Sequence, residues 1–370
     1  MTYCIVLLYS FTFLYIFSGN YKNNIARINE KALNFILSIP AFLWLIVLGT
    51  QYYVGTDYPT YYKYFDSGID LGLYLVKKEY LFYWLSYFIY KSIFPAQTGF
   101  FLFSFIQVFF LCKFLLKMKT DRLDIFIIVY FCCATCFYNQ MNALRQYTAM
   151  AIFLYSIFFI LERKLIKYCA CIFFAAMFHI SALFLIVLYP FYFLFNLKSG
   201  KLYRLFLFLS LLLMYKGIDS LVTFFVAKTS YSFYLNTFYF LEQNRKSFKN
   251  IITKLIFFPF YLRVIYWFPV YIKDYTNRDV FLIKLGIIFY GIKLIAMSSF
   301  FLSRFSMYFD LIAYVPLYYY LRELIRHNTI KKWQRMIELL LFLSISLGLW
   351  FVKVIIAPSG EYAYQSVLFR

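Results

Sequence analysis

Four ionisable residues stand out in a sequence that is otherwise strongly apolar. They are Asp57, Arg145, His179 and Arg304, and each lies within or beside an apolar run. An aspartate or a histidine in such a place could orient a hydroxyl group or take its proton, and two arginines could bind a phosphate or pyrophosphate. Because ionisable groups are costly inside a membrane, these residues are the first candidates for function.

His179 lies in the apolar stretch Ala175-Ala-Met-Phe-His179-Ile-Ser181. The ordinary pKa of histidine, about 6.5, suits proton transfer or contact with a phosphate. The alternative is a structural histidine whose hydrogen bonds join two short helices. Both interpretations place His179 at a junction between residues 166–178 and 180–196.

Arg145 and Arg304 are predicted to open two helices that start at the outer membrane surface. A helix N-terminus offers unpaired N–H groups and partial positive charge, so an added guanidinium would make a strong anion site. Two such ends at one depth suggest a pyrophosphate or another anionic headgroup as the ligand. The alternative is that each arginine extends from apolar surface to water.

Asp57 lies in the segment Gly55-Thr-Asp57-Tyr58-Pro59, which is followed by further tyrosines. Its carboxylate could act as a general base or bind a sugar, and tyrosine rings stack on sugar faces. The alternative is a helix cap, because aspartate and proline are frequent at helix starts. Glu79 has the same alternative, as a neighbour of the N-cap of the next helix.

These residues need a membrane scaffold to position them. The chain is 64% hydrophobic, its mean hydropathy is +0.71, and apolar runs recur from end to end. Runs of about 20 residues match the length that a helix needs to cross a bilayer, whereas barrel strands would alternate over about ten residues. The predicted fold class is an all-α, polytopic integral membrane protein.

The runs predict about twelve membrane-spanning helices in one membrane domain, residues 1–370, with outer loops at 51–98 and 217–250. They lie near residues 2–18, 33–50, 99–116, 123–139, 145–161, 166–178, 180–196, 203–216, 251–271, 280–298, 303–321 and 336–353. A further apolar stretch near 79–94 is short for a span and is predicted to form a re-entrant or interfacial helix at the outer surface.

The 37 lysines and arginines set the predicted orientation. More than half of them fall in one alternating set of short loops, and cytoplasmic loops collect such residues. Both termini and the candidate residues are then predicted to lie on the outer side of the membrane. The net charge of +21 therefore reflects topology and does not indicate a nucleic-acid partner. Residues 2–18 lack a basic start and a cleavage site, so they are interpreted as the first span.

No metal site or cofactor is predicted. The seven cysteines lie in or beside apolar runs, and the pair Cys133 and Cys136 has CxxC spacing without a second pair or a nearby histidine. We interpret these cysteines as packing residues. Phosphate-binding loops, nucleophile elbows and paired acidic metal ligands are also absent from the sequence.

The order of the motifs resembles the EpsG family of bacterial Wzy-like surface polysaccharide polymerases. The resemblance covers about residues 50 to 365 and is carried by Gly-Thr-Asp57-Tyr58, then Glu79 with its short apolar helix, then Arg145-Gln146-Tyr-Thr-Ala-Met-Ala, then Phe-His179-Ile-Ser-Ala-Leu, then Arg304-Phe-Ser-Met-Tyr308. It implies a GT-C-like fold of the kind found in lipid-phosphate-dependent glycosyltransferases. Segment 217–250 aligns with nothing in the family pattern.

The resemblance implies an enzyme that joins polyprenyl-pyrophosphate-linked oligosaccharides, as donor and acceptor, outside the cytoplasmic membrane. Arg145 and Arg304 would bind the pyrophosphate, His179 or Asp57 would act on the acceptor hydroxyl, and Gln146, Tyr308, Glu79 and Tyr58 would support them. A chain-length regulator and a flippase are the implied protein partners. The alternatives are a glycan ligase and a flippase or transporter of the same lipid-linked sugars. Lys284 and Lys293, which lie inside an apolar run, favour the transporter alternative.

Overall fold

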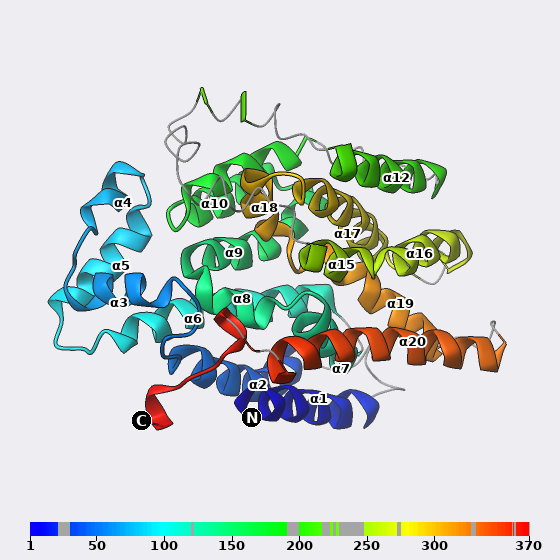
Figure 1. Cartoon of the computed structure of the whole chain (residues 1–370), viewed down its shortest axis with the longest axis horizontal. Coiled ribbons are helices and arrows are strands. Elements are labelled where there is room, and N and C mark those ends of the chain that lie inside the picture. The colour runs from blue at the N-terminus through cyan, green and yellow to red at the C-terminus, as the bar shows by residue number, and fades with distance from the viewer. Residues whose placement is uncertain are drawn as a thin grey trace. The chain divides into compact units, whose positions relative to one another are not determined.

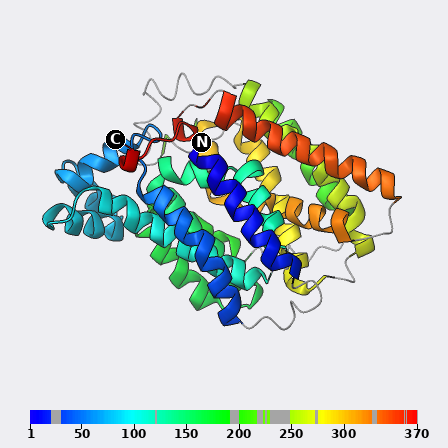
Figure 2. The ribbon, with the colours of Figure 1, turned by 90° about the horizontal axis from the view of Figure 1, so that it is seen from below.

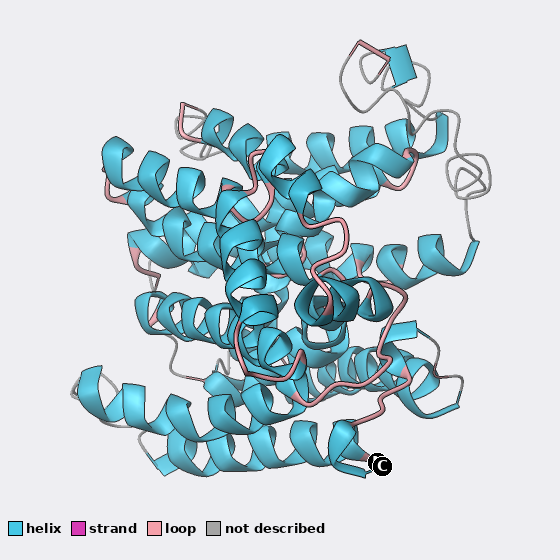
Figure 3. Ribbon diagram, turned by 90° about the vertical axis from the view of Figure 1, so that its left-hand side faces the viewer, coloured by secondary structure: helices cyan, strands magenta, loops and turns pink. Residues whose placement is uncertain are grey.

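Apolar runs of helical length form helices throughout the part of the chain that the computed structural model describes. Figure 3 shows helices and loops and no strand among those residues. The described residues are 1–20, 30–119, 122–190, 200–216, 223–224, 227–228, 248–271, 275–326, 331–356, 358 and 360–369. They fall into two compact units, residues 1–192 with 340–370, and residues 193–339. The single membrane domain predicted from the sequence stays a prediction.

The first unit contains the N-terminal helices and the C-terminal segment (Figure 1). Its helices are α1 (Thr2–Asn20), α2 (Glu30–Gly49), α3 (Tyr58–Asp66), α4 (Gly72–Val76), α5 (Tyr80–Lys91), α6 (Gln97–Met118), α7 (Leu123–Ile128), α8 (Cys136–Asn142), α9 (Leu144–Leu161) and α10 (Leu165–Ala176). They are joined by the π-helix η2 (Val129–Cys133) and the 3-10 helix η3 (Ile180–Leu188). The second half of α20 (Lys332–Phe351) follows, with η8 (Val352–Ile356), η9 (Gly360–Tyr362) and η10 (Val367–Phe369).

Helix α9 forms the centre of the first unit. It packs against α6 on one side and α10 on another, and α6 packs in turn against α2. Helix α1 lies beside α2 and also contacts α7 (Figure 2). Most residues of α9 are buried, including Leu144, Gln146 and Tyr147 in its first turn.

Three short helices, α3, α4 and α5, form the predicted outer loop 51–98 and group together in Figure 1. Helix α5 buries Phe82, Ser86 and Ile89 on one face. It has 12 residues, so it is about 18 Å long, too short for a hydrocarbon core of about 30 Å. The helix predicted near 79–94 is therefore present, and its interfacial position stays a prediction.

The CxxC segment marks a break between α7–η2 and α8, where the chain bends by 51°. Thr135 adopts a left-handed conformation, with φ of 54°, between the two cysteines. Cys133, Cys136 and Thr135 are buried, and both cysteines are free thiols. The predicted packing role fits this position, and the predicted continuous helix 123–139 is instead a bent pair.

The second unit is built around α17 (Asn277–Ala296). It also contains α12 (Gly200–Lys216), α15 (Phe248–Leu255), α16 (Phe258–Tyr271), α18 (Phe300–Ser306), the 3-10 helices η6 (Met307–Phe309) and η7 (Ile312–Tyr314), and α19 (Val315–Arg326). A capping box between Thr276 and Asp279 starts α17. The predicted helix 303–321 is wrong as one element, because the chain forms two 3-10 turns between Ser306 and Val315. Buried Asp310 in this break pairs with buried Lys293 of α17.

Four helices in the described part are long and apolar enough to cross a membrane, or five if the bent pair is one span. The four are Lys31–Gly49, Gln97–Met118, Leu144–Leu161 and Lys332–Ile356. Helices occur at most of the predicted positions, but the count of twelve spans is not confirmed. Most of segment 217–250 lies outside the described residues. The orientation of the termini and loops stays a prediction.

Candidate functional site

Glu79 is the N-cap residue of α5, and backbone hydrogen bonds fix its position. The preceding residue, Lys78, has a left-handed conformation with φ of 62°. The Glu79 N–H donates to the Tyr74 carbonyl at 2.8 Å, and its carbonyl accepts from the Tyr83 N–H at 3.0 Å. The carboxylate makes no capping bond to α5 and is 1% exposed. It is therefore directed into the first unit.

The Glu79 carboxylate joins three elements of the first unit. Oε2 forms an ion pair with Nη1 of Arg145, at the start of α9. Oε1 lies 2.9 Å from Nδ1 of His179 and accepts from the Ile180 backbone N–H at 3.2 Å. One buried anion thus fixes an arginine and a histidine relative to each other.

The environment keeps Glu79 ionised. Burial by itself raises the pKa of the carboxyl group, but the hydrogen bond with His179 and the positive charge of Arg145 lower it by more. The net pKa lies below the ordinary value of 4.5. Glu79 therefore carries its negative charge at neutral pH and can hold both partners.

His179 occupies the predicted junction, between α10 and η3. Its backbone is extended, with φ of −151° and ψ of 110°. An ionised carboxylate only accepts hydrogen bonds, so Nδ1 carries the proton and Nε2 is the basic nitrogen of the neutral ring. Burial and the charge of Arg145 lower the pKa of His179 below 6.5, although the contact with Glu79 raises it. The ring is therefore neutral at pH 7 and able to accept a proton.

Backbone hydrogen bonds hold α5 and α10 together beside this pair. The N–H groups of Leu81 and Phe82, in the first turn of α5, donate to the Met177 carbonyl at 3.0 and 3.2 Å. Met177 follows α10 and precedes His179 by two residues. The distance between Glu79 and His179 is thus set by the main chain as well as by their side chains.

Arg145 is the second residue of α9, so its predicted place in a helix N-terminal turn is confirmed. Its guanidinium carbon lies 4.5 Å from the ring centre of Tyr74 and 5.3 Å from that of Phe82. The side chain also has a hydrogen-bonding interaction with Tyr61. The Nε atom is buried and has no hydrogen-bond partner in the protein. Arg145 is held by aromatic rings and Glu79, which differs from an arginine that only extends to water.

The loop that carries Asp57 is attached beside Arg145 through Asn142, the last residue of α8. The Asp57 N–H donates to the Asn142 side-chain oxygen at 2.9 Å. Gly55 has φ of 77°, and a Cβ there would lie 2.4 Å from the same Asn142 oxygen. Glycine is required at this position because a side chain would displace the loop. Asp57 is the N-cap residue of α3, as the alternative predicted, but its side chain makes no capping bond.

Residues 33–366 match the family model described as the EpsG family. The chain belongs to the EpsG family. The EpsG family is a Wzy-like polysaccharide polymerase family, and the match covers nearly the whole chain. Neither a curated protein nor a solved structure matches the chain. Membership and the apolar helices together indicate a membrane protein with a polysaccharide polymerase-type function.

Within this EpsG family member, two predicted supporting residues of the first unit are buried, and their supporting role stays a prediction. Tyr58 is buried, stacks on Phe100 with ring centres 4.6 Å apart, and donates to the Gln97 side-chain oxygen at 3.2 Å. Gln146 is buried next to Arg145 in α9. Both support the elements that carry Asp57 and Arg145.

Arg304 and Tyr308 belong to the second unit. The prediction that Arg304 opens a helix is wrong, because it lies in the last turn of α18 and the chain leaves that helix at Ser306. A helix C-terminus carries partial negative charge, so the helix-dipole argument for an anion site does not apply to Arg304. Tyr308 is fully buried, 5.9 Å from Phe305 between ring centres. The pyrophosphate role of Arg304 stays a prediction.

Sequence reasoning missed the central position of Glu79 in this EpsG family member, together with Tyr61, Tyr74 and Asn142. The sequence predicts Glu79 as a supporting residue, with a helix-cap neighbour as the alternative, because its distance along the chain from the other motifs hides its contacts. The signal that could have identified it is the acidic residue itself, placed at the start of an apolar helix. Asn142 lies three residues before Arg145, which is a second signal.

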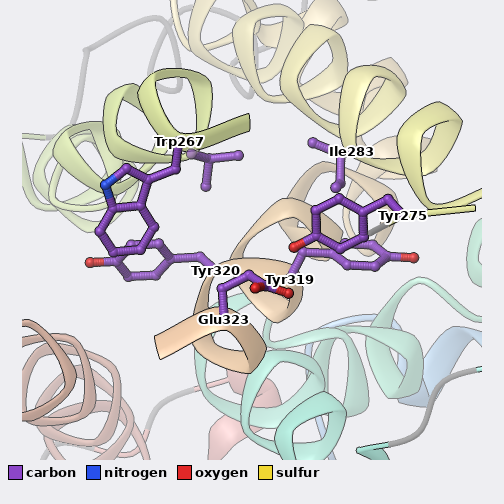
Figure 4. A pocket seen from close by; sticks show the side chains of 7 residues that line it. Trp267, Tyr275, Ile283, Tyr319, Tyr320 and Glu323 are labelled. Carbon is purple, nitrogen blue, oxygen red and sulfur yellow. The ribbon is translucent and has the colours of Figure 1, made fainter. Parts of the chain in front are cut away.

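A separate aromatic pocket lies in the second unit and contains none of the predicted site residues (Figure 4). Trp267 stacks on Tyr320 with ring centres 5.3 Å apart, and Tyr275 meets Tyr319 edge to face at 5.7 Å. Glu323 lies between these two pairs in Figure 4. In the described part of the chain, no group of His, Cys, Asp and Glu side chains could hold a metal ion.

Proposed function

We propose that this protein is a polymerase that joins polyprenyl-pyrophosphate-linked oligosaccharide repeat units at the outer face of the bacterial cytoplasmic membrane. The observation that carries the proposal is that the buried carboxylate of Glu79 contacts both a neutral histidine and an arginine. Family membership supports the class of reaction. The lipid bilayer supplies the carrier lipid, and a flippase and a chain-length regulator would act before and beside the enzyme.

In the proposed reaction, a hydroxyl group of the incoming unit attacks the anomeric carbon of the growing chain. Nε2 of His179 takes the hydroxyl proton, since Nδ1 is committed to Glu79. The new bond joins the hydroxyl oxygen to the anomeric carbon, and the bond from that carbon to the pyrophosphate oxygen breaks. The pyrophosphate leaves on its lipid, and Asp57 orients the attacking hydroxyl.

Arg145 would stabilise the charge that develops on the leaving pyrophosphate. Such preorganised stabilisation is usually the largest contribution to catalysis. Nη1 is engaged by Glu79, while the buried Nε is a donor without a protein partner. A phosphate oxygen would satisfy that donor. The pyrophosphate role predicted for Arg304 is proposed separately, on the basis of its charge and not of a helix dipole.

The transporter alternative depended on Lys284 and Lys293 within α17. Lys293 forms an ion pair with Asp310 at the break before α19, and Lys284 is buried in the same helix. Family membership supports the polymerase over a transporter. A ligase differs from a polymerase only in its acceptor. We therefore favour the polymerase over the transporter. A polymerase and a ligase are distinguished by which acceptor molecule the enzyme consumes.

His179→Ala should reduce chain formation on the order of 10²–10⁴-fold while the protein level holds. The test supplies purified wild-type protein, in vesicles, with lipid-linked single repeat units from cells that lack the polymerase, and follows chain length on gels. The matched control is His327→Ala, because His327 is the only other histidine in the sequence. A wild-type protein that moves the units across the vesicle membrane without joining them would contradict the polymerase proposal. Normal chains from His179→Ala would make His179 structural.

A further inference from the structure

Exposed tyrosines gather on the loop and helix that follow α2. Tyr53 is 56% exposed and Tyr62 is 38% exposed. Their ring centres lie 5.4 and 6.0 Å from that of Tyr58, which is buried and stacked on α6. We call Tyr53, Tyr58 and Tyr62 the tyrosine platform. Because a buried ring anchors two exposed ones, the platform presents aromatic surface to a ligand without a rearrangement.

The backbone at Tyr53 is strained. Its φ is 48°, a left-handed conformation that is uncommon for a bulky side chain. The neighbouring Tyr52 N–H donates to the Gln365 carbonyl at 2.9 Å, and Gln51 pairs with Ser366. The C-terminal segment thus holds the loop in this shape. Strain that a fold maintains beside an exposed ring is typical of ligand sites.

Polar groups that suit a sugar border the platform. Asp57 and the exposed Thr56 and Thr60 lie on the same loop and first helical turn, and the Thr56 hydroxyl donates to Asp57 Oδ1 at 3.3 Å. Aromatic faces pack against the apolar C–H face of a pyranose, and a carboxylate accepts hydrogen bonds from its hydroxyls. The Asp57 charge disfavours a phosphate at this place.

The platform adjoins residues that are proposed to act in catalysis. The Asp57 N–H bond to Asn142 attaches the loop three residues before Arg145. Tyr61, the residue before Tyr62, is buried on the inner side of α3 and interacts with Arg145. Helix α3 therefore carries Tyr62 of the platform on its exposed face and Tyr61, which interacts with Arg145, on its buried face.

We propose that Tyr53, Tyr62 and Asp57 form the acceptor subsite, which binds a pyranose ring of the incoming repeat unit. This proposal rests on the proposed polymerase function. The tyrosine rings hold the sugar face, and Asp57 accepts a hydroxyl hydrogen bond. The subsite places the acceptor next to Arg145 and His179 without taking part in bond breaking.

The first test measures kinetics with lipid-linked chains at saturation and single lipid-linked units varied. Tyr62→Leu and Tyr53→Gly should each raise the KM for the single unit roughly three- to tenfold, with kcat within twofold of wild type, because only acceptor contact is lost. Tyr62→Phe should behave like wild type because it keeps the ring. The matched control is Tyr266→Leu, because Tyr266 is a 66% exposed tyrosine on α16.

The second test does not need catalysis. Saturation-transfer NMR with the free oligosaccharide, released from its lipid by mild acid, should show transfer to sugar C–H protons in wild type and a loss in Tyr62→Leu and Tyr53→Gly. An unchanged KM for the single unit, together with unchanged saturation transfer in both variants, would overturn the proposal of an acceptor subsite. If wild type binds the oligosaccharide on these residues but forms no chains, the polymerase proposal fails and the sugar site stands.

Discussion

Glu79→Gln should reduce chain formation on the order of 10²–10⁴-fold, the range of a general base that is lost or misplaced. The substitution keeps the size of the side chain and removes the charge that holds His179 and Arg145. An uncharged amide can donate as well as accept, so Nδ1 of His179 loses the group that fixes its proton. Turnover of purified protein with lipid-linked single units measures the effect.

Glu79→Gln should also shift the pH dependence of activity to lower pH. In wild type, activity should fall on the acid side as His179 becomes protonated, below its ordinary pKa of 6.5. Glu79 raises the pKa of His179, while burial and Arg145 lower it. Removing the Glu79 charge should therefore move the acid limb of the remaining activity to a still lower pH. An acid limb that stays in place would show that Glu79 does not control His179.

A surface glutamate provides the control for Glu79→Gln. Glu162 also pairs with two cations, Lys117 at 2.9 Å and Lys164 at 2.7 Å, but it is partly exposed. Glu162→Gln should retain wild-type turnover, because exposed ion pairs contribute at most about 1 kcal/mol to stability. Equal losses in both glutamine variants would indicate a general effect on the protein rather than a catalytic one.

Arg145→Lys should reduce chain formation roughly 10- to 150-fold and leave single units on the carrier lipid. Lysine keeps the positive charge but lacks the forked, planar guanidinium group of arginine. In Arg145, that group lies over the Tyr74 ring and pairs with Glu79. The loss of one charge-assisted hydrogen bond costs about 1.5–3 kcal/mol, which gives that range of rates. The measurement is turnover together with the amount of carrier-linked single unit.

The second unit offers a matched arginine. Arg263 pairs with Glu338 at 2.6 Å and its guanidinium carbon lies 4.6 Å from the Trp267 ring, so it has the same two kinds of contact. Arg263→Lys should keep wild-type turnover. Arg304→Lys measures the proposed second arginine separately. Near wild-type turnover of both Arg145→Lys and Arg304→Lys would contradict the pyrophosphate role and favour transport.

Much of the architecture followed from apolar periodicity. The starts of α9 and α10 and the junction at His179 were predicted correctly, because each of these positions lies at the end of an apolar run of helical length. The helix predicted near 79–94 was also present. Helix breaks were not predictable from these runs. The bend at Thr135 and the 3-10 turns after Ser306 depend on backbone dihedrals and on the Lys293–Asp310 pair.

The candidate site was predicted in part. Arg145, His179 and Asp57 were identified from residue type, and the structure brings all three into the same part of the first unit. Glu79 was predicted only as a supporting residue, and its contacts with both Arg145 and His179 were not predictable, since it lies 66 residues from the one and 100 from the other. Only the fold shows that one carboxylate reaches both.

The central claim is that Glu79 and His179 act as one unit in chain formation. A double-mutant cycle tests it most directly, with turnover measured for Glu79→Gln, His179→Ala and the double variant on lipid-linked single units. Residues that act as a unit give non-additive losses. We predict that the double variant is no slower than the slower single variant. Losses that multiply would contradict the account, because they would show two independent contributions.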